Sequence, residues 1–304
     1  MKKLVVFDTG LTATEPIMKA FATGVINSKT GWLVEYQKLD QFLTEGLAKL
    51  KAGRDAVAVF GVLRGTGSII KKAKQLGIDY FYIDHAYFNP GFQKPLWLRI
   101  TKNDHAIGTI CDVPSDRWKS LFRDQNRVQP WRLNSQRGDR ILICPPTNAI
   151  EWFMDIDGSW SSEIVGKLKQ HLPKATWPKL IVRRKPKEPI VDQSGNLLGF
   201  KNYDYENSIE EELKRATCVV AYNSMVALTA TRMGIPVIVG PISCCRSVAF
   251  SIEAFCSGET PPSFEMEPKR RRDLFRWLAY NQWNFEEIHG GIAWRMLLQP
   301  SRQL

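Results

Sequence analysis

Residues 215–240, with the sequence RATCVVAYNSMVALTATRMGIPVIVG, constrain the fold more than any other part of this chain. The apolar run at 218–221 predicts a buried strand, and a helical pattern follows it. Gly234 is placed to end that helix, and Pro236 prevents its continuation. A second apolar run at 237–239 predicts another buried strand. The stretch therefore predicts a strand, a helix and a strand, the repeating unit of parallel α/β sheets.

A polar pair, Asn223 and Ser224, opens the predicted helix directly after the first strand. Free backbone N–H groups and the helix dipole make such a terminus a favourable place for a phosphate. Asn and Ser are also common helix caps, so the pair has a purely structural interpretation as well. The sequence leaves both interpretations open.

Apolar runs alternate with helical patterns along most of the chain, which predicts an α/β fold class with mostly parallel sheets. The alternation breaks at 86–137, which holds loops and a basic, aromatic segment, and residues 187–207 are predicted to be irregular. The predicted strands are 4–7, 32–36, 56–60, 78–83, 140–144, 179–182, 218–221 and 237–239, and the predicted helices are 15–22, 42–51, 68–76, 161–171, 209–215, 224–233, 247–255, 269–280 and 285–297.

The chain has 304 residues, enough for two domains of ~150 residues each, and the sequence predicts a boundary near Gly138. The net charge of +11 divides unevenly there. Residues 1–137 hold 21 Lys and Arg against 12 Asp and Glu, whereas residues 138–304 hold 21 against 19. This excess predicts a polyanionic or membrane-surface partner for the first domain. A basic composition without such a partner is the alternative.

The block 178–245 resembles the donor-binding half of glycosyltransferases with the two-domain GT-B fold, in which a polar pair opens a helix under the donor diphosphate and is followed by "GIPVI". The most similar patterns occur in enzymes of surface-polysaccharide synthesis and in small phage-encoded, DNA-modifying glycosyltransferases. The resemblance implies two Rossmann-like domains, 1–137 and 138–284, with a cleft between them. It also implies a terminal helix at 285–304 that packs on the first domain, and a nucleotide-sugar donor, most readily a UDP-sugar, with no cofactor and no metal.

Polar side chains follow the predicted strands of the second half, and ligands of doubly wound sheets bind beyond these strand ends. Arginine grips phosphate oxygens in a fork, and a helix terminus adds N–H donors. A solvated turn is the alternative interpretation of the three successive basic residues at 183–185. The predicted donor-binding residues are Thr147, Asn148, Arg183, Arg184, Lys185, Asn223, Ser224 and Arg246.

The strand ends of the first half offer a base for the acceptor hydroxyl, because an Asp, Glu or His can accept its proton. Asp84 and His85 are the first choice, and Asp8 is the second. An acidic residue at a strand end also serves as a cap or turn former, which is the structural alternative. The glycine-rich stretch 61–67, GVLRGTG, lacks the GK[ST] ending of a phosphate-binding P-loop. It predicts close approach of the backbone to a ligand or a neighbouring loop.

The segment 116–137 interleaves tryptophan with arginine and lysine. Cations neutralise phosphates and aromatic faces stack on bases, so the segment predicts a nucleic-acid acceptor. An amphipathic helix with core tryptophans and solvated arginines is the alternative. The predicted acceptor- or DNA-binding residues are Arg64, Arg117, Lys119, Arg123, Arg127, Trp131 and Arg132.

Other classes of protein are disfavoured. None of the six cysteines forms a CxxC pair and the four histidines have no metal-ligand spacing, so neither a zinc site nor a disulfide framework is expected. No apolar run approaches the ~18 residues of a membrane span, and the N-terminal run is too short for a signal peptide. We therefore expect a cytoplasmic protein, in the host cytoplasm if it is viral, without stable membrane insertion.

Three hypotheses remain for the function. The first is a glycosyltransferase that acts on a hydroxymethyl-pyrimidine base in DNA, since charge and aromatic side chains would help to extrude a base. The second keeps the chemistry but makes the acceptor a surface polysaccharide or a lipid-linked glycan. The third is a non-enzymatic α/β protein that binds nucleotides or nucleic acid. The sequence does not indicate an oligomeric state.

Overall fold

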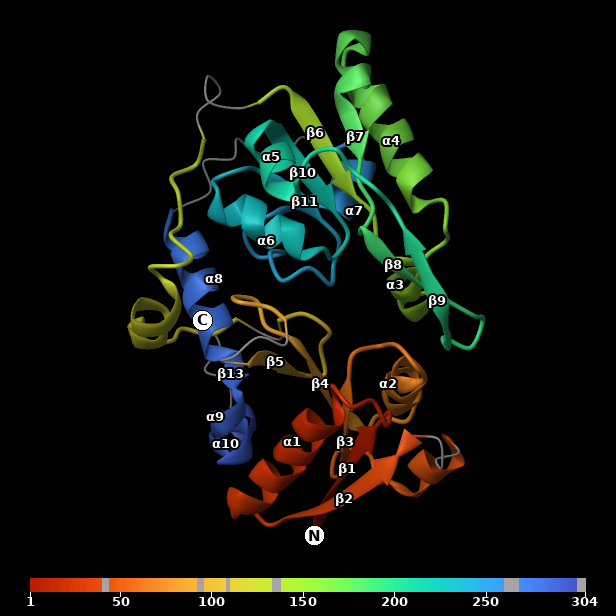
Figure 1. The fold of residues 1–304 in the computed structure, drawn as a ribbon, viewed down its shortest axis with the longest axis vertical. Helices are drawn as coiled ribbons and strands as arrows, with labels where there is room; N and C mark the ends of the chain where they lie inside the picture. Colours follow the sequence, from red (N-terminus) through yellow and green to blue (C-terminus); the bar gives the residue numbers. More distant parts are fainter. Residues whose placement is uncertain (40–43, 92–95, 108–109, 133–137, 260–267, 300–304) are drawn as a thin grey trace. The chain divides into compact units, whose positions relative to one another are not determined.

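The computed structural model describes residues 1–39, 44–91, 96–107, 110–132, 138–259 and 268–299. The chain forms two compact units, each with its own sheet (Figure 1). Unit 1 comprises Met1–Val113, Asp192–Leu197 and Trp277–Leu304, and unit 2 comprises Pro114–Val191 and Leu198–Arg276.

Unit 1 contains a six-stranded sheet with the order β13-β5-β4-β3-β1-β2. The four strands from β4 to β2 pair in parallel, whereas β5 and β13 are added antiparallel at one edge. The edge strands β5 and β13 were not predicted from the sequence. The elements are β1 (Lys2–Asp8), α1 (Glu15–Asn27), β2 (Trp32–Lys38), η2 (Thr44–Lys49), β3 (Ala56–Phe60), α2 (Thr66–Gln75), β4 (Asp79–His85), β5 (Trp97–Lys102), β13 (Gln282–Asn284), α9 (Phe285–His289) and α10 (Ile292–Leu298).

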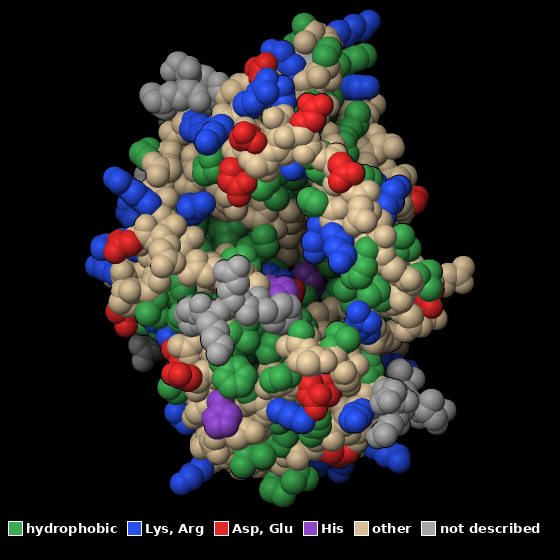
Figure 2. Space-filling model, viewed as in Figure 1, with side chains coloured by type: hydrophobic (Ala, Val, Ile, Leu, Met, Phe, Trp, Pro, Cys, Tyr) green, Lys and Arg blue, Asp and Glu red, His purple; other side chains and the backbone are tan. Residues whose placement is uncertain are grey.

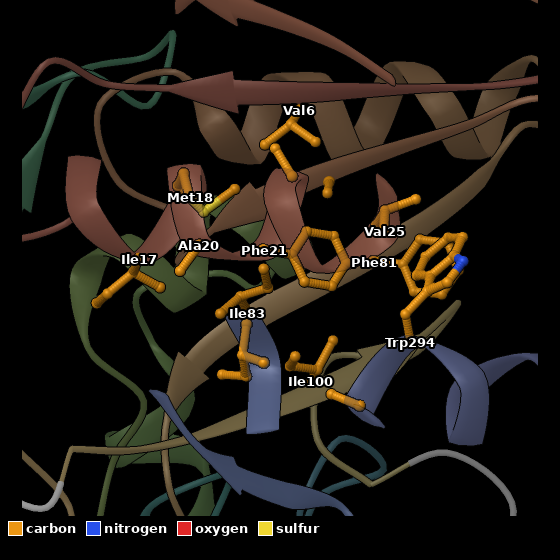
Figure 3. Close-up of a cluster of buried hydrophobic side chains, with 14 of the residues drawn as sticks. Val6, Ile17, Met18, Ala20, Phe21, Val25, Phe81, Ile83, Ile100 and Trp294 are labelled. Carbon is orange, nitrogen blue, oxygen red and sulfur yellow. The ribbon is translucent and has the colours of Figure 1, made fainter. Parts of the chain in front are cut away.

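The C-terminal helices of unit 1 complete its core (Figure 3). The ring of Trp294, on α10, lies 5.8 Å from that of Phe21 on α1 and 4.7 Å from that of Phe81 on β4. Gly24 lets α1 approach α9 closely, because a Cβ atom there would lie 1.9 Å from the carbonyl oxygen of Ile288. The predicted terminal helix from residue 285 is thus two short helices, and they are part of the unit that the N-terminus begins.

Unit 2 contains a five-stranded, all-parallel sheet with the order β12-β11-β10-β6-β7. The predicted strand, helix and strand at 215–240 are confirmed as β10, α6 and β11. In Figure 1, α5 and α6 lie in front of the sheet and α7 lies behind it. The elements are η3 (Trp118–Phe122), β6 (Arg140–Cys144), α3 (Asn148–Met154), α4 (Trp160–His171), η5 (Lys174–Lys179), β7 (Leu180–Val182), α5 (Ile209–Lys214), β10 (Ala216–Ala221), α6 (Met225–Arg232), β11 (Val237–Val239), β12 (Phe250–Ser251), α7 (Ile252–Cys256) and α8 (Pro268–Tyr280), whose residues from Trp277 onward belong to unit 1.

The stretch 187–207, predicted to be irregular, contains a two-stranded sheet of β8 (Lys187–Val191) and β9 (Leu197–Asn202). The connecting turn is held by Asp192, whose Oδ1 accepts hydrogen bonds from the backbone N–H groups of Ser194 and Asn196. Gly195 supplies the positive φ that the turn requires. A short loop with Asp and Gly between two apolar runs is a hairpin signal, so this prediction was wrong for a local reason.

The basic segment 116–132 belongs to unit 2, although the boundary expected near Gly138 assigned it to the first domain. The ring of Trp118 lies 5.3 Å from that of Phe275 on α8. The backbone N–H of Arg132 donates to the carbonyl of Gly234, where a Cβ atom would lie 1.9 Å from the carbonyl oxygen of Pro130. The segment is therefore packed on α6 and α8, and the compact units change over at Val113.

This division changes the distribution of charge. Unit 1 holds 17 Lys and Arg against 13 Asp and Glu, and unit 2 holds 25 against 18. The larger positive excess thus lies on the unit that was expected to bind the donor. Of the predicted helix at 42–51, residues 42 and 43 lie outside the described residues and Thr44–Lys49 forms a 3₁₀ helix. Within the described part of the chain, no helix has the length and apolar character needed to cross a membrane.

Candidate functional site

In unit 2, the carboxyl ends of four parallel strands share one edge of the sheet. Ala221 of β10 is paired with Cys144 of β6 and with Val239 of β11, and Ile143 of β6 is paired with Val182 of β7. The chain places β7 on one side of β6 and β10 on the other, so the topological switch point lies between β6 and β10. Ligands of doubly wound sheets bind at such a point, beyond the strand ends.

The loop after β10 leads into α6 through Asn223 and Ser224. The Ser224 Oγ accepts a hydrogen bond from the backbone N–H of Val226, which makes it the cap of the helix. Its hydroxyl proton is still available to a ligand oxygen, because a hydroxyl both accepts and donates. Gly240 allows the next loop to lie against this one, since a Cβ atom there would lie 2.7 Å from the Tyr222 ring. Both predicted residues therefore lie on the carboxyl side of the switch point.

Arg183 and Arg184, at the end of β7, have different surroundings. The guanidinium of Arg183 lies over the Tyr205 ring, 4.1 Å from its centroid. Arg184 Nη1 donates to Glu188 Oε1 at 3.2 Å, and the Tyr205 hydroxyl exchanges hydrogen bonds with the Arg184 backbone. The charge of Arg184 is therefore compensated by a carboxylate. The stacked guanidinium of Arg183 has no acidic partner among the described residues.

Glu188 and Glu151 are two buried acidic residues that sequence reasoning missed. Glu188, on β8, accepts a hydrogen bond from the backbone N–H of Asn148 at the start of α3. The Asn148 side chain in turn accepts from the Val191 N–H. The protein's own carboxylate thus occupies the beginning of α3, next to Thr147. Burial raises the pKa of Glu151, the Arg184 charge lowers it, and the Glu188 charge raises it further.

The other two basic residues predicted to bind the donor follow strands at the same edge, but fewer contacts define their positions. Lys185 is exposed after β7. Arg246 follows β11, and its guanidinium donates to the carbonyl of Pro241 at 3.3 Å. Cys144, at the end of β6, is buried, which raises the pKa of its thiol to about 12, and the charge of Arg183 acts in the opposite direction. Arg183 is therefore close enough to the end of β6 to act on it electrostatically.

In unit 1, the first-choice base Asp84 forms a buried ion pair. Its Oδ2 accepts hydrogen bonds from Arg99 Nη2 at 2.8 Å and from the Tyr82 hydroxyl at 2.6 Å. Burial raises the pKa of Asp84, but the Arg99 charge and the Tyr82 hydrogen bond more than offset burial, so its pKa lies below the usual range. A carboxylate with a lowered pKa is a poor proton acceptor. Its neighbour His85 packs edge-on against Phe60, with ring centroids 5.9 Å apart.

A second histidine belongs to the same buried cluster and was not singled out from the sequence. His105 stacks on Tyr82 with ring centroids 4.6 Å apart. Burial lowers the pKa of His105 to about 3, and the nearby Arg99 charge contributes in the same direction. The cluster is therefore a structural group built around the Arg99 guanidinium, which also lies 5.7 Å from the Tyr82 ring centroid.

Asp8 lies at the switch point of the sheet of unit 1, because β2 and β3 lie on opposite sides of β1. It is 1% exposed, and its Oδ1 accepts a hydrogen bond from the Gly10 N–H. Its Oδ2 and the Tyr36 hydroxyl are both buried without a hydrogen-bond partner among the described residues. Burial raises the pKa of Tyr36, and the Asp8 carboxylate adds to this effect. The loop 61–67 follows β3 at the same switch point and carries the exposed Arg64.

Two members of the basic segment make structural contacts. The Trp131 ring lies under the Arg271 guanidinium, 4.2 Å from its carbon atom, and burial lowers the pKa of Arg271 to about 10. Arg132 Nη1 donates to the carbonyls of Leu213 and Lys214 at the end of α5. Arg117 is partly exposed, whereas Lys119, Arg123 and Arg127 are exposed. Among the described residues, no group of three or more His, Cys, Asp or Glu side chains is arranged to hold a metal ion.

No family model matches this sequence, and comparison with curated proteins finds no match. Among solved structures, the KpsC β-Kdo 2,4-transferase of Thermosulfurimonas dismutans is 13% identical, with 97% of this chain and 98% of that chain covered and a TM-score of 0.48. The KpsC β-Kdo 2,7-transferase of the same organism is 13% identical, covering 96% and 98%, with a TM-score of 0.45. The S. aureus MnaA–UDP co-structure is 10% identical, covering 99% of each chain, with a TM-score of 0.30. Since these scores are low, the fold class rests on the strand order and register above, which confirm two Rossmann-like units with mostly parallel sheets.

Proposed function

We propose that this chain is a glycosyltransferase that binds a nucleotide-diphosphate sugar at the carboxyl edge of the sheet of unit 2. The observation that carries the proposal is the switch point of an all-parallel sheet, flanked by the capped start of α6, with the guanidinium of Arg183 at a strand end of the same edge. A diphosphate needs N–H donors and a cation, and this edge offers both.

The two arginines would divide their roles. Arg183 has no carboxylate partner among the described residues, and Tyr205 restricts its guanidinium to one plane. It would bind the diphosphate and stabilise the charge that develops when the sugar leaves. Arg184 is paired with Glu188 and would instead hold β8 against the start of α3.

The base for the acceptor hydroxyl would come from unit 1, and Asp8 is the better candidate. It lies at the switch point, and one of its buried oxygens has no hydrogen-bond partner among the described residues. Asp84 is held by Arg99 and Tyr82 instead. Tyr36 lies close enough to Asp8 that, in addition to burial, the carboxylate raises the pKa of its hydroxyl.

The acceptor that we propose is a hydroxyl of a surface glycan. The DNA hypothesis depended on most of the positive excess lying in the first domain, but unit 1 holds a smaller excess than unit 2. Trp131 and Arg132, which were expected to bind DNA, make contacts within unit 2. A hydroxymethyl-pyrimidine acceptor therefore has less physical support than a glycan hydroxyl.

A panel of nucleotide sugars tests the function. A true donor present at ~100 times its dissociation constant should stabilise the folded protein by about 2.7 kcal/mol, which appears as a rise in Tm. Slow hydrolysis of that donor without acceptor would separate an enzyme from a nucleotide-binding protein. A failure of every nucleotide sugar to raise Tm, while the protein is folded, would contradict the proposal.

A further inference from the structure

An exposed basic surface covers part of unit 2, away from the strand ends discussed above. Its members come from the N-terminal part of α8 and from the segment that packs on α8 through the Trp118–Phe275 contact. Figure 2 shows Lys and Arg side chains along the left flank, where Figure 1 draws the yellow segment and, beside it, α8. We define the basic surface as Lys119, Leu121, Arg127, Lys269, Arg270 and Arg272.

Helix stability does not explain the cations on α8. The first five residues of α8 include Lys269, Arg270 and Arg272, and its first turn has no acidic residue. Cations at a helix N-terminus oppose the helix dipole, and each costs a few tenths of a kcal/mol or more. Arg271, which lies between two of these cations in the sequence, is buried and donates hydrogen bonds to the carbonyls of Gln129 and Thr231. The three exposed cations make no ion pair within the described residues.

The segment that packs on α8 also exposes an apolar side chain. Leu121 is 41% exposed, and in the sequence it lies between the exposed residues Lys119 and Arg123. A leucine in this position does not help to bind a linear polyanion, but it can enter the interface of a bilayer whose headgroups attract the neighbouring cations. Arg123 is paired with Asp124 at 3.0 Å and is therefore left out of the surface.

We propose that this basic surface docks unit 2 on a membrane rich in anionic phospholipids. The cations would lie at the headgroups and Leu121 would reach the apolar boundary below them. The proposal does not depend on the transfer activity, because it concerns other residues than the donor site. It would place a glycosyltransferase beside acceptors that are anchored in a membrane.

Sedimentation with lipid vesicles tests the proposal on the full chain. At low salt the protein should bind vesicles of phosphatidylcholine mixed with phosphatidylglycerol, and it should not bind vesicles of phosphatidylcholine alone. Each cation near an anionic surface contributes about five-fold in affinity. The triple variant Lys269→Gln/Arg270→Gln/Arg272→Gln should therefore bind roughly a hundred-fold more weakly. Its Tm should not fall, because the changes relieve repulsion at the helix terminus.

Two further variants test whether vesicle binding depends on this surface rather than on the total charge, and whether the surface binds lipid rather than nucleic acid. Lys29→Gln/Lys49→Gln/Lys51→Gln removes the same charge from exposed positions of unit 1 and should keep vesicle binding within about two-fold. Leu121→Ser should weaken vesicle binding about five-fold and leave binding to duplex DNA unchanged. No binding to anionic vesicles, an equal loss in the unit 1 variant, or binding to DNA without binding to vesicles would each overturn the proposal.

Discussion

The two sheets have the same topology around their first strands, but they differ in the side chains that the strand ends carry. In unit 1 the carboxylates Asp8 and Asp84 lie in the last two residues of β1 and β4, and both are largely buried. In unit 2 it ends β7 with two arginines and opens α6 with a hydroxyl cap. One edge is therefore suited to accept a proton and the other to bind an anion. A transfer from a phosphorylated donor to a hydroxyl needs both properties.

At the carboxyl edge of each sheet, one charged residue is paired with a residue of opposite charge and another of the same type is not. Asp84 is paired with Arg99, whereas the Oδ2 of Asp8 has no hydrogen-bond partner within the described residues. Arg184 is paired with Glu188, whereas Arg183 stacks on an aromatic ring. The same residue type at one edge of a sheet can thus be structural in one place and available for chemistry in another.

The largest effect is expected at Asp8. Replacing Asp8 by Asn removes the proton acceptor but keeps the shape of the side chain, so turnover should fall by ~10²–10⁴-fold. Donor affinity should be unchanged, because the donor is expected on unit 2. Steady-state kinetics and calorimetry with the donor identified by the panel would measure both. Wild-type turnover in a folded Asp8→Asn protein would return the assignment to Asp84 or His85.

The matching change at Asp84 should affect stability instead. Asp84→Asn leaves the buried guanidinium of Arg99 without its compensating charge, and breaking such a pair costs about 3–5 kcal/mol. Urea unfolding of the variant against the wild type measures this loss. A variant that is as stable as the wild type but inactive would reverse the comparison and make Asp84 the base.

The two arginines should differ in the same way, with smaller effects. Arg183→Ala should weaken binding of the nucleotide diphosphate by about 1.5–3 kcal/mol, the range for hydrogen bonds to charged groups. Arg184→Ala should leave that affinity nearly unchanged and lower Tm, because the buried Glu188 loses its cationic partner. Isothermal calorimetry measures the affinity of both variants for the nucleotide diphosphate. Equal losses of affinity would mean that both arginines bind the donor.

The sequence predicted the elements whose signals are local. The strand β3 was predicted with its observed bounds, and β10, α6 and β11 were predicted from apolar runs bounded by Gly and Pro. The strand β13 could not be predicted, because three residues become a strand only when β5 offers its edge. The domain boundary was misplaced because residues 116–132 have a composition of their own, whereas their packing on α8 is a tertiary property.

The candidate site was predictable in position but not in detail. The strand-end rule identified Arg183, Arg184 and Ser224 from the sequence alone. It could not rank the two arginines, because their difference depends on β8 carrying Glu188 to the start of α3. The contact between Glu188 and Asn148 joins residues forty positions apart, and the composition of the sequence does not indicate it.

The smallest effect concerns pH and tests the Asp84–Arg99 pair without changing turnover. The folded state holds the pKa of Asp84 below its usual range, so the carboxylate binds a proton more readily in the unfolded chain. The stability that it contributes is present above the unfolded pKa of about 3.9 and is lost as the pH falls through the folded pKa. The difference in unfolding free energy between wild type and Asp84→Asn should therefore be constant near neutral pH and shrink below about pH 4. Urea unfolding of both proteins at several pH values measures this, and a difference that stays constant into acid would show that the Asp84 charge does not stabilise unit 1.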